Sequence, residues 1–263
     1  MNCWTEKSIE FAVQRNYLDE LFKVYPLSPN LRRELSREQV DAVRLAYDAR
    51  DNLKLVETLL DTELFPLKDS YIPLLRHDRG ALVRNPQTVN RIAGNLYHMG
   101  CEAIIEKCTA PKETNRQMGP MFKNWIARGV IGVPVLNDPE EFLHTQGNCI
   151  LSSTDSVMQD FSREFLGFTR SKGVDFLARS GGKYVVGEAK LLTDFGGHQN
   201  AQFDDALSTL HSFTASEFHV IPVAIIDGVI YIRNHSKIHD YLQHHPEDNI
   251  MSALVLREFL YSL

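Results

Sequence analysis

The stretch that decides the fold reads Gly173-Val-Asp175-Phe-Leu-Ala-Arg-Ser-Gly-Gly-Lys-Tyr-Val-Val-Gly187-Glu188-Ala-Lys190. Residues 173–178 and 184–189 are strand-like, and Ser180-Gly-Gly182 supplies a turn between them. We therefore predict a hairpin that pairs residues 174–179 with 183–188. Because side chains alternate along a strand, Glu188 and Lys190 share one face. The same pairing brings Asp175 near Glu188 across the two strands.

Charged side chains on this hairpin need a physical reason, because the apolar residues around Glu188 indicate a largely buried strand. Buried carboxylates are costly unless a cation neutralises them. Two carboxylates with few other ligands suit Mg²⁺, a hard cation that keeps some of its waters. Such a site suits phosphodiester hydrolysis, with Lys190 stabilising the charge that develops on the phosphate. The alternative is an ordinary ion pair on a structural strand.

Outward from the hairpin, helices and strands alternate. Residues 154–166 and 201–213 have apolar residues at helical spacing, and 218–226 is rich in strand formers. Asp227-Gly228 is a hairpin signal leading into residues 229–232, and a last helix is expected from about 248 to 261. This order predicts an α/β (α+β) fold, a mixed β-sheet flanked by helices, with a helical N-terminal region.

The first half of the chain is predicted to be helical. We expect helices over 8–22, over 52–61 and over 86–108, the last with Asn85 as its N-cap. Ser36-Arg-Glu-Gln39 is typical of a capping box at the start of another helix. We therefore divide the chain into a mainly helical region, 1–130, for DNA binding and dimerisation, and an α/β nuclease catalytic core, 131–263.

The run from Gly173 through Asp175 to Glu188 and Lys190 resembles the PD-(D/E)xK nuclease superfamily, and Lys190 alone among the eleven lysines has a carboxylate two residues before it. Val174 stands where the motif has proline. The resemblance covers about residues 154–232, and the whole chain looks like a type II restriction endonuclease with the restriction-endonuclease-like core. It implies that Asp175 and Glu188 bind metal, that Lys190 is the catalytic lysine, and that Glu164 on the preceding helix is a further candidate ligand.

Two polar stretches are candidates for DNA contacts. In the first, basic and amide side chains match the donors that read guanine and adenine, although the stretch could also be an ordinary exposed connection. In the second, a glycine pair precedes a row of amides, although Asn200 could instead cap the next helix. The candidates are Asn115, Arg116, Gln117, Lys123, His198, Gln199, Asn200 and Gln202.

The chain has 263 residues, 43% of them hydrophobic, and a formal net charge of −6. Residues 68–128 hold ten Lys or Arg against five Asp or Glu, whereas residues 131–263 hold nine against seventeen. A basic surface for phosphates beside an acidic region for metal suits a nuclease acting on double-stranded DNA, although surface charge also varies by chance. The four cysteines form no C-x-x-C pair, and no apolar run could span a membrane, so we expect a cytoplasmic protein without a membrane partner.

Three functions remain open at this point. The favoured one is Mg²⁺-dependent, sequence-specific cleavage of DNA by a homodimer. A homodimer is expected because a double-strand break needs two catalytic sets, whereas the chain contains one Asp…Glu-x-Lys set and no internal repeat. The dimer surface would come from the helical first half or from the C-terminal helix. The alternatives are a DNA repair or recombination nuclease with the same core, and a non-catalytic DNA-binding protein with a structural acidic strand pair.

Overall fold

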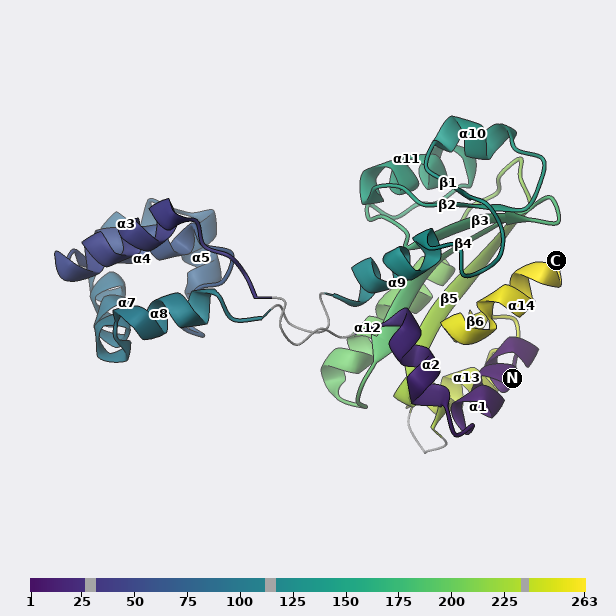
Figure 1. Cartoon of the computed structure of the whole chain (residues 1–263), viewed down its shortest axis with the longest axis horizontal. Helices are drawn as coiled ribbons and strands as arrows, with labels where there is room; N and C mark the ends of the chain where they lie inside the picture. The colour runs from purple at the N-terminus through teal and green to yellow at the C-terminus, as the bar shows by residue number, and fades with distance from the viewer. Residues whose placement is uncertain (27–31, 112–116, 233–236) are drawn as a thin grey trace. The chain divides into compact units, whose positions relative to one another are not determined.

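The computed structural model describes residues 1–26, 32–111, 117–232 and 237–263. The chain forms two compact units (Figure 1). One consists of Ser28–Glu113 and is helical; the other combines Met1–Leu27 with Thr114–Leu263 and carries the β-sheet. The predicted class, a mixed sheet flanked by helices with a helical region earlier in the chain, is confirmed. The unit boundaries differ from the predicted division at residue 130, because both ends of the first half pack with the sheet.

The predicted hairpin is present. Strand β3 (Phe176–Ser180) runs antiparallel to β4 (Lys183–Leu192), with Phe176 opposite Gly187 and Ser180 opposite Lys183. Two glycines, Gly181 and Gly182, form the turn, as expected. The hairpin lies at the centre of the sheet, where β4 is paired along its whole length.

The described strands form one six-stranded sheet in the order β1-β2-β3-β4-β5-β6. The pairs β1–β2, β4–β5 and β5–β6 are parallel, whereas β2–β3 and β3–β4 are antiparallel. The four strands that flank the hairpin are β1 (Val135–Leu136), β2 (Cys149–Leu151), β5 (Val220–Gly228) and β6 (Ile250–Met251).

Helices cover both faces of this sheet (Figure 1). On one face, Val185 and Ala189 of β4 pack in a core with residues of α2 (Tyr17–Val24), α9 (Met118–Ala127) and α14 (Leu256–Tyr261). The opposite face is covered by four helices: α10 (Pro139–His144), α11 (Asp155–Phe165), α12 (Gly197–Leu210) and α13 (Lys237–His244). Because side chains alternate, Glu188 and Lys190 belong to this second face.

The first residues of the chain correct the sequence prediction. In place of one helix over 8–22, the chain forms α1 (Cys3–Ala12), capped by Asn2, and then α2. The buried side of α2, with Leu21 and Val24, packs against the sheet core and not within the helical unit. An apolar stripe predicts that a helix is buried, but it does not say against what, so the stripe alone does not assign α2 to either compact unit.

The helical unit has its own core, built around residues such as Leu55, Leu59 and Ile92. The predicted capping box of Ser36 and Gln39 is confirmed, as is a helix at 52–60. The predicted helix over 86–108 is interrupted at Gly100, whose φ of 90° only glycine adopts readily. The helices of this unit are α3 (Arg37–Asp48), α4 (Asn52–Leu60), α5 (Ile72–His77), α6 (Ala81–Arg84), α7 (Pro86–Met99) and α8 (Cys101–Cys108). The Asn85 side chain donates to the carbonyl of Ala81 instead of capping α7.

Two further predictions near the C-terminus were wrong. β5 does not turn at Asp227-Gly228 into a hairpin; it continues into a 3₁₀ turn, Val229–Tyr231, and pairs on both sides with parallel strands. In place of a helix from about 248, the chain forms β6, a 3₁₀ turn at Ala253–Val255, and only then α14. In both places burial against the sheet outweighs the local signal. No helix in the described parts of the chain is long and apolar enough to cross a membrane.

Candidate active site

Glu188 and Lys190 lie on the same face of β4, as the alternation predicts. The Glu188 side chain is 5% exposed and the Lys190 side chain 23%. The Lys190 ammonium lies 2.5 Å from Glu188 Oε1. Burial acts to lower the pKa of Lys190, but the charges of Glu188, Asp205 and Asp175 outweigh it and raise the pKa above its ordinary value. Lys190 is therefore protonated, and its partly exposed ammonium lies beside the buried carboxylate of Glu188.

Asp175 immediately precedes β3 and is fixed against β4 by its backbone and its side chain. Its N–H donates to the carbonyl of Gly187 at 2.9 Å, and its Oδ2 accepts from the N–H of Ala189 at 3.0 Å. Burial raises the pKa of the Asp175 carboxyl, and the neighbouring Glu188 carboxylate raises it further, despite the Ala189 amide. The pairing thus brings the two predicted carboxylates together, and the cost of their mutual repulsion is what a bound cation would relieve.

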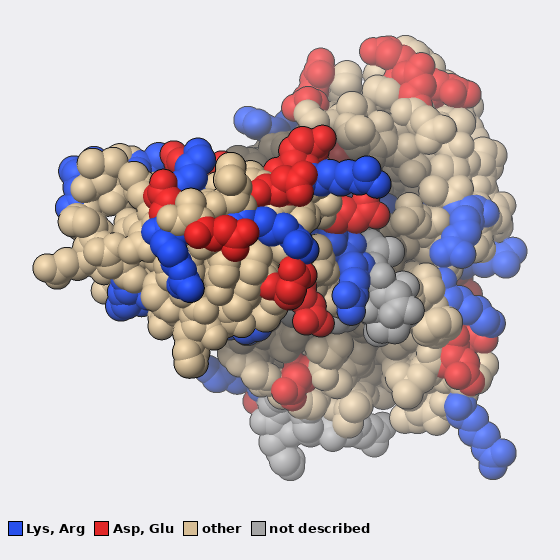
Figure 2. All heavy atoms as spheres, turned by 60° about the vertical axis from the view of Figure 1, so that its left-hand side comes forward, with Lys and Arg blue, Asp and Glu red and all other residues tan. Residues whose placement is uncertain are grey.

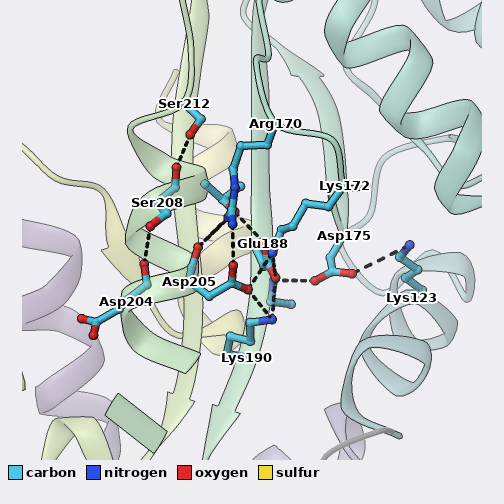
Figure 3. A network of polar contacts seen from close by, with 12 residues as sticks. Lys123, Arg170, Lys172, Asp175, Glu188, Lys190, Asp204, Asp205, Ser208 and Ser212 are labelled. Carbon is cyan, nitrogen blue, oxygen red and sulfur yellow. Dashed lines mark hydrogen bonds and ion pairs between the residues drawn. The ribbon is translucent and has the colours of Figure 1, made fainter. Parts of the chain in front are cut away.

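Glu188 has further partners that the sequence did not reveal. Helix α12 crosses β4 and places the hydroxyl of Thr209 2.7 Å from Glu188 Oε2. The ammonium of Lys172, in the segment before β3, lies 2.6 Å from Glu188 Oε1. Both oxygens of this carboxylate are therefore held in place from the α12 side of the sheet (Figure 3).

A third carboxylate, Asp205 of α12, completes this side of the cluster. Its Oδ1 pairs with Arg170 at 2.8 Å, and its Oδ2 lies 2.7 Å from Lys172 and 3.3 Å from Lys190. Burial acts to raise the pKa of Asp205, but hydrogen bonds from Lys172 and Arg170 outweigh it and hold that pKa well below its usual range. Asp205 is therefore ionised and surrounded by cations.

Lys123, which the sequence suggested as a DNA contact, lies on a helix and belongs to this cluster. It lies on α9, where it pairs with Asp155 and approaches Asp175 Oδ1 to 3.8 Å (Figure 3). Helix α9 passes close to the site, since a Cβ on Gly119 would lie 3.6 Å from Asp175 Oδ1. The four carboxylates and four cations of the cluster balance in formal charge: Asp155, Asp175, Glu188 and Asp205 against Lys123, Arg170, Lys172 and Lys190.

The residues fit a divalent cation of the hard, oxygen-binding kind. Asp175 and Glu188 are adjacent carboxylates, and no set of three or more His, Cys, Asp or Glu residues gathered as metal ligands occurs in the described residues. Mg²⁺ needs only one or two protein carboxylates, because it retains waters and binds substrate phosphate. A neutral cluster that gains such an ion becomes positive and attracts an anionic phosphodiester.

Glu164, the further candidate ligand, is not brought to the other two. It is exposed near the end of α11 and lines a pocket with Gly167 and Thr214. The start of the same helix, at Asp155, is what reaches Lys123. At about 1.5 Å per residue, the nine residues from 155 to 164 carry Glu164 roughly 13 Å along the helix axis.

The other predicted DNA contacts fall in three places. Asn115 and Arg116 lie outside the described residues, and Gln117 immediately precedes α9. Gln199 is buried within α12, which begins at Gly197, so Asn200 is not its N-cap. His198 is exposed in the first turn of that helix and contacts Gln202.

The excess of basic residues in the stretch 68–128 does not produce a basic surface on the helical unit, because acidic residues of the same unit pair with them. Within the helical unit Arg79, Arg84 and Arg91 each form an ion pair, with Asp61, Asp78 and Asp69. Residues 28–113 hold thirteen Lys or Arg and thirteen Asp or Glu. Figure 2 accordingly shows basic and acidic side chains interspersed on the face of this unit turned toward the viewer.

A mixed sheet that holds adjacent carboxylates and a lysine on its central hairpin is consistent with a restriction-endonuclease-like core. The comparison with protein families agrees: the model of the Tsp45I type II restriction enzyme family matches residues 2–263. The chain belongs to this family, and it is therefore a site-specific endonuclease. No curated protein and no solved structure matches it.

Proposed function

We propose that this protein is a Mg²⁺-dependent type II restriction endonuclease of the PD-(D/E)xK superfamily that hydrolyses phosphodiester bonds at a specific double-stranded DNA sequence. The observation that supports this most is the convergence of Asp175, Glu188 and Lys190 on one hairpin, with each side chain fixed by its neighbours. The cluster is neutral without a metal and has accessible cations at its rim.

In this proposal Asp175 and Glu188 hold the Mg²⁺, which would polarise the phosphate and acidify a bound water. Lys190 is placed to donate to a phosphoryl oxygen and to stabilise its negative charge in the transition state. The Ala189 amide orients Asp175, and Thr209 orients Glu188, so that neither carboxylate must reorganise when substrate arrives. Both orienting contacts come from groups that do not change charge.

DNA would approach the surface that follows β4. Residues 193–198, from Thr193 to His198, are exposed directly after the strand that carries Lys190. His198, Asn200 and Gln202 on α12 are described polar side chains that we assign to DNA contact, together with Gln117 before α9. Gln199 is buried and is assigned a structural role instead.

We propose that the active form is a homodimer, since one cluster cuts one strand. The predicted C-terminal surface is unsuited to this role, because Leu256, Phe259 and Leu260 are in the core. An uncharged groove of about 780 Å³ lies beside the end of β4 and is bordered by Leu18, Phe22 and Ile232, which are 74%, 59% and 57% exposed. A second copy bound at this groove would cover these apolar side chains. Because the groove lies beside the end of β4, the same contact would fix the distance between the two active sites.

A plasmid digest tests the proposed activity. With Mg²⁺, we expect a discrete set of fragments with defined ends, and with excess EDTA no cutting. A smear of fragments, or cutting only at branched or damaged DNA, would favour a repair or recombination nuclease. Sedimentation with a duplex that carries the cleavage site tests the dimer: one chain per duplex with clean double-strand cutting would contradict it.

A further inference from the structure

Lys172 occupies a position between two carboxylates that come from different elements. Its ammonium lies 2.6 Å from Oε1 of Glu188 on β4 and 2.7 Å from Oδ2 of Asp205 on α12. Figure 3 shows the Lys172 side chain reaching into the gap between them. Because Glu188 also faces the Asp175 side of the cluster, this carboxylate stands between two cation-binding positions, and an ammonium fills one of them.

The surrounding hydrogen bonds fix the width of that gap. Arg170 binds the Asp205 carboxylate, the Asp205 carbonyl and the Thr209 hydroxyl, at 2.8, 3.0 and 2.7 Å. Thr209 is fully buried, and its hydroxyl in turn donates to Glu188 Oε2 at 2.7 Å. A closed ring thus runs from Arg170 through Thr209, Glu188 and Lys172 to Asp205 and back to Arg170.

Fold stability alone is a weak explanation for this ring. Ion pairs that lie near the surface contribute little, and buried ones often contribute nothing net after desolvation. The Lys172 side chain is 30% exposed, so the gap is open to solvent and to ions. A lysine here instead meets an electrostatic need of the site, since without it the four carboxylates of the cluster would be left with three cations.

Nucleases with two metal ions place them about 3.5–4 Å apart, with a carboxylate shared between them. Glu188 is positioned to be shared in this way, between Asp175 on one side and Asp205 on the other. On the Asp205 side, however, ammonium groups supply the positive charge: Lys172 lies between the two carboxylates, and Lys190 lies 2.5 Å from Glu188 Oε1 and 3.3 Å from Asp205 Oδ2. Lys190 is the one that the proposed function assigns to the phosphate, so Lys172 is the ammonium that stays in the gap when DNA is bound.

We infer that the Lys172 ammonium takes the place of a second divalent ion, so that each active site binds a single one. The inference rests on the proposed metal-dependent function and names Lys172, with Asp205 as its anchor, as a positioning residue for Glu188. It follows that removing the ammonium opens the Glu188–Asp205 gap to a second cation.

Isothermal titration calorimetry of the full chain with Ca²⁺, in the presence of duplex DNA, measures the stoichiometry without relying on cleavage. We expect about one ion per chain for the wild type and about two for Lys172→Met, because the gap then loses the ammonium between its two carboxylates while the phosphate of the bound duplex engages Lys190. Lys172→Arg, which keeps the charge, should remain at about one, and adding Asp205→Asn to Lys172→Met should restore about one. Lys183→Met, at the start of β4 and away from the cluster, is the matched control and should not change the stoichiometry.

Each outcome decides something. Two ions bound by the wild type, or one ion bound by a folded Lys172→Met, would overturn the inference and leave the proposed nuclease function standing. No ion bound by the wild type would instead remove the metal-dependent function itself. If Lys172→Met does not fold, as judged by circular dichroism, Lys172→Gln replaces it, because its amide can still donate to Glu188 while its charge is absent; one ion bound there would equally overturn the inference.

Discussion

Asp227 lies on β5, opposite Leu191 of the strand that carries Lys190, and it is fully buried. Its carboxylate accepts from the hydroxyl of Tyr25 at 2.8 Å and from that of Ser252. Burial raises the pKa of Asp227 from the ordinary 3.8 to about 6, although these hydrogen bonds and the N–H of Ala253 oppose the rise. Compared with the unfolded chain, the folded protein therefore favours the protonated form of the Asp227 carboxyl.

Because the folded pKa is the higher one, the stabilisation is fully present below about pH 4 and is lost as the pH rises through about 6. Each unit of pKa difference corresponds to about 1.4 kcal/mol, so the loss amounts to roughly 3 kcal/mol by about pH 8. Asp227→Asn cannot ionise and should lack this loss. Its free energy of unfolding should fall by about 3 kcal/mol less than that of the wild type over this range.

Urea denaturation at several pH values between about 4 and 8 measures the difference. Asp204→Asn removes an exposed carboxylate and serves as the matched control, with the pH dependence of the wild type expected. Parallel curves for Asp227→Asn and wild type would refute the reasoning, because they would mean that the buried carboxyl does not titrate on folding.

Four further predictions concern the site and its supports. Lys190→Ala should reduce the single-turnover cleavage rate by about 10²–10⁴-fold with DNA affinity nearly unchanged in a filter-binding assay; cutting within about threefold of wild type would remove Lys190 from catalysis. Asp175→Asn and Glu188→Gln should each reduce cleavage by orders of magnitude, and Ca²⁺ should support DNA binding without cutting; full activity in EDTA would contradict the metal assignment. Gly187→Ala should lower the free energy of unfolding by about 1–3 kcal/mol, because its Cβ would lie 2.2 Å from the carbonyl oxygen of Val223, whereas Gly147→Ala has open space and should change it little; equal melting temperatures would be inconsistent with this close approach. Leu18→Glu combined with Phe22→Glu should give a monomer in sedimentation, whereas Leu45→Glu, at an exposed position of the helical unit, should not; a dimer that survives the double substitution uses another surface.

The central hairpin could be predicted because the information that specifies it is local. Alternation along one strand places Glu188 and Lys190 on a common face, and two glycines fix the turn that brings Asp175 alongside. The capping box at Ser36 is local in the same sense, since both of its partners lie within one turn. These features depend on residues a few positions apart, so no knowledge of the tertiary structure is needed.

The errors occur where a local signal competes with burial. Asp227-Gly228 has the composition of a hairpin turn, yet β5 pairs with β4 as far as Gly228, and the chain then enters a 3₁₀ turn instead of folding back as a strand. The predicted helix over 86–108 contains Gly100, a weak helix former, and the chain breaks there into α7 and α8, both of which contribute to the core of the helical unit. At Asp227-Gly228 the deciding contacts come from β4, more than thirty residues earlier in the chain.

Asp205 and Thr209 were missed for a different reason. They are four residues apart and hence neighbours on α12, on a side that also buries Ala206 and Leu210. A polar pair that interrupts an apolar helix face is the same anomaly that made Glu188 conspicuous on its strand, so a signal was present in the sequence. What the pair binds depends on how α12 crosses β4, and this crossing alone decides that Asp205 meets Lys172 while Thr209 meets Glu188. The sequence can therefore identify the residues that require a polar partner, whereas only the packing of helix on sheet identifies that partner.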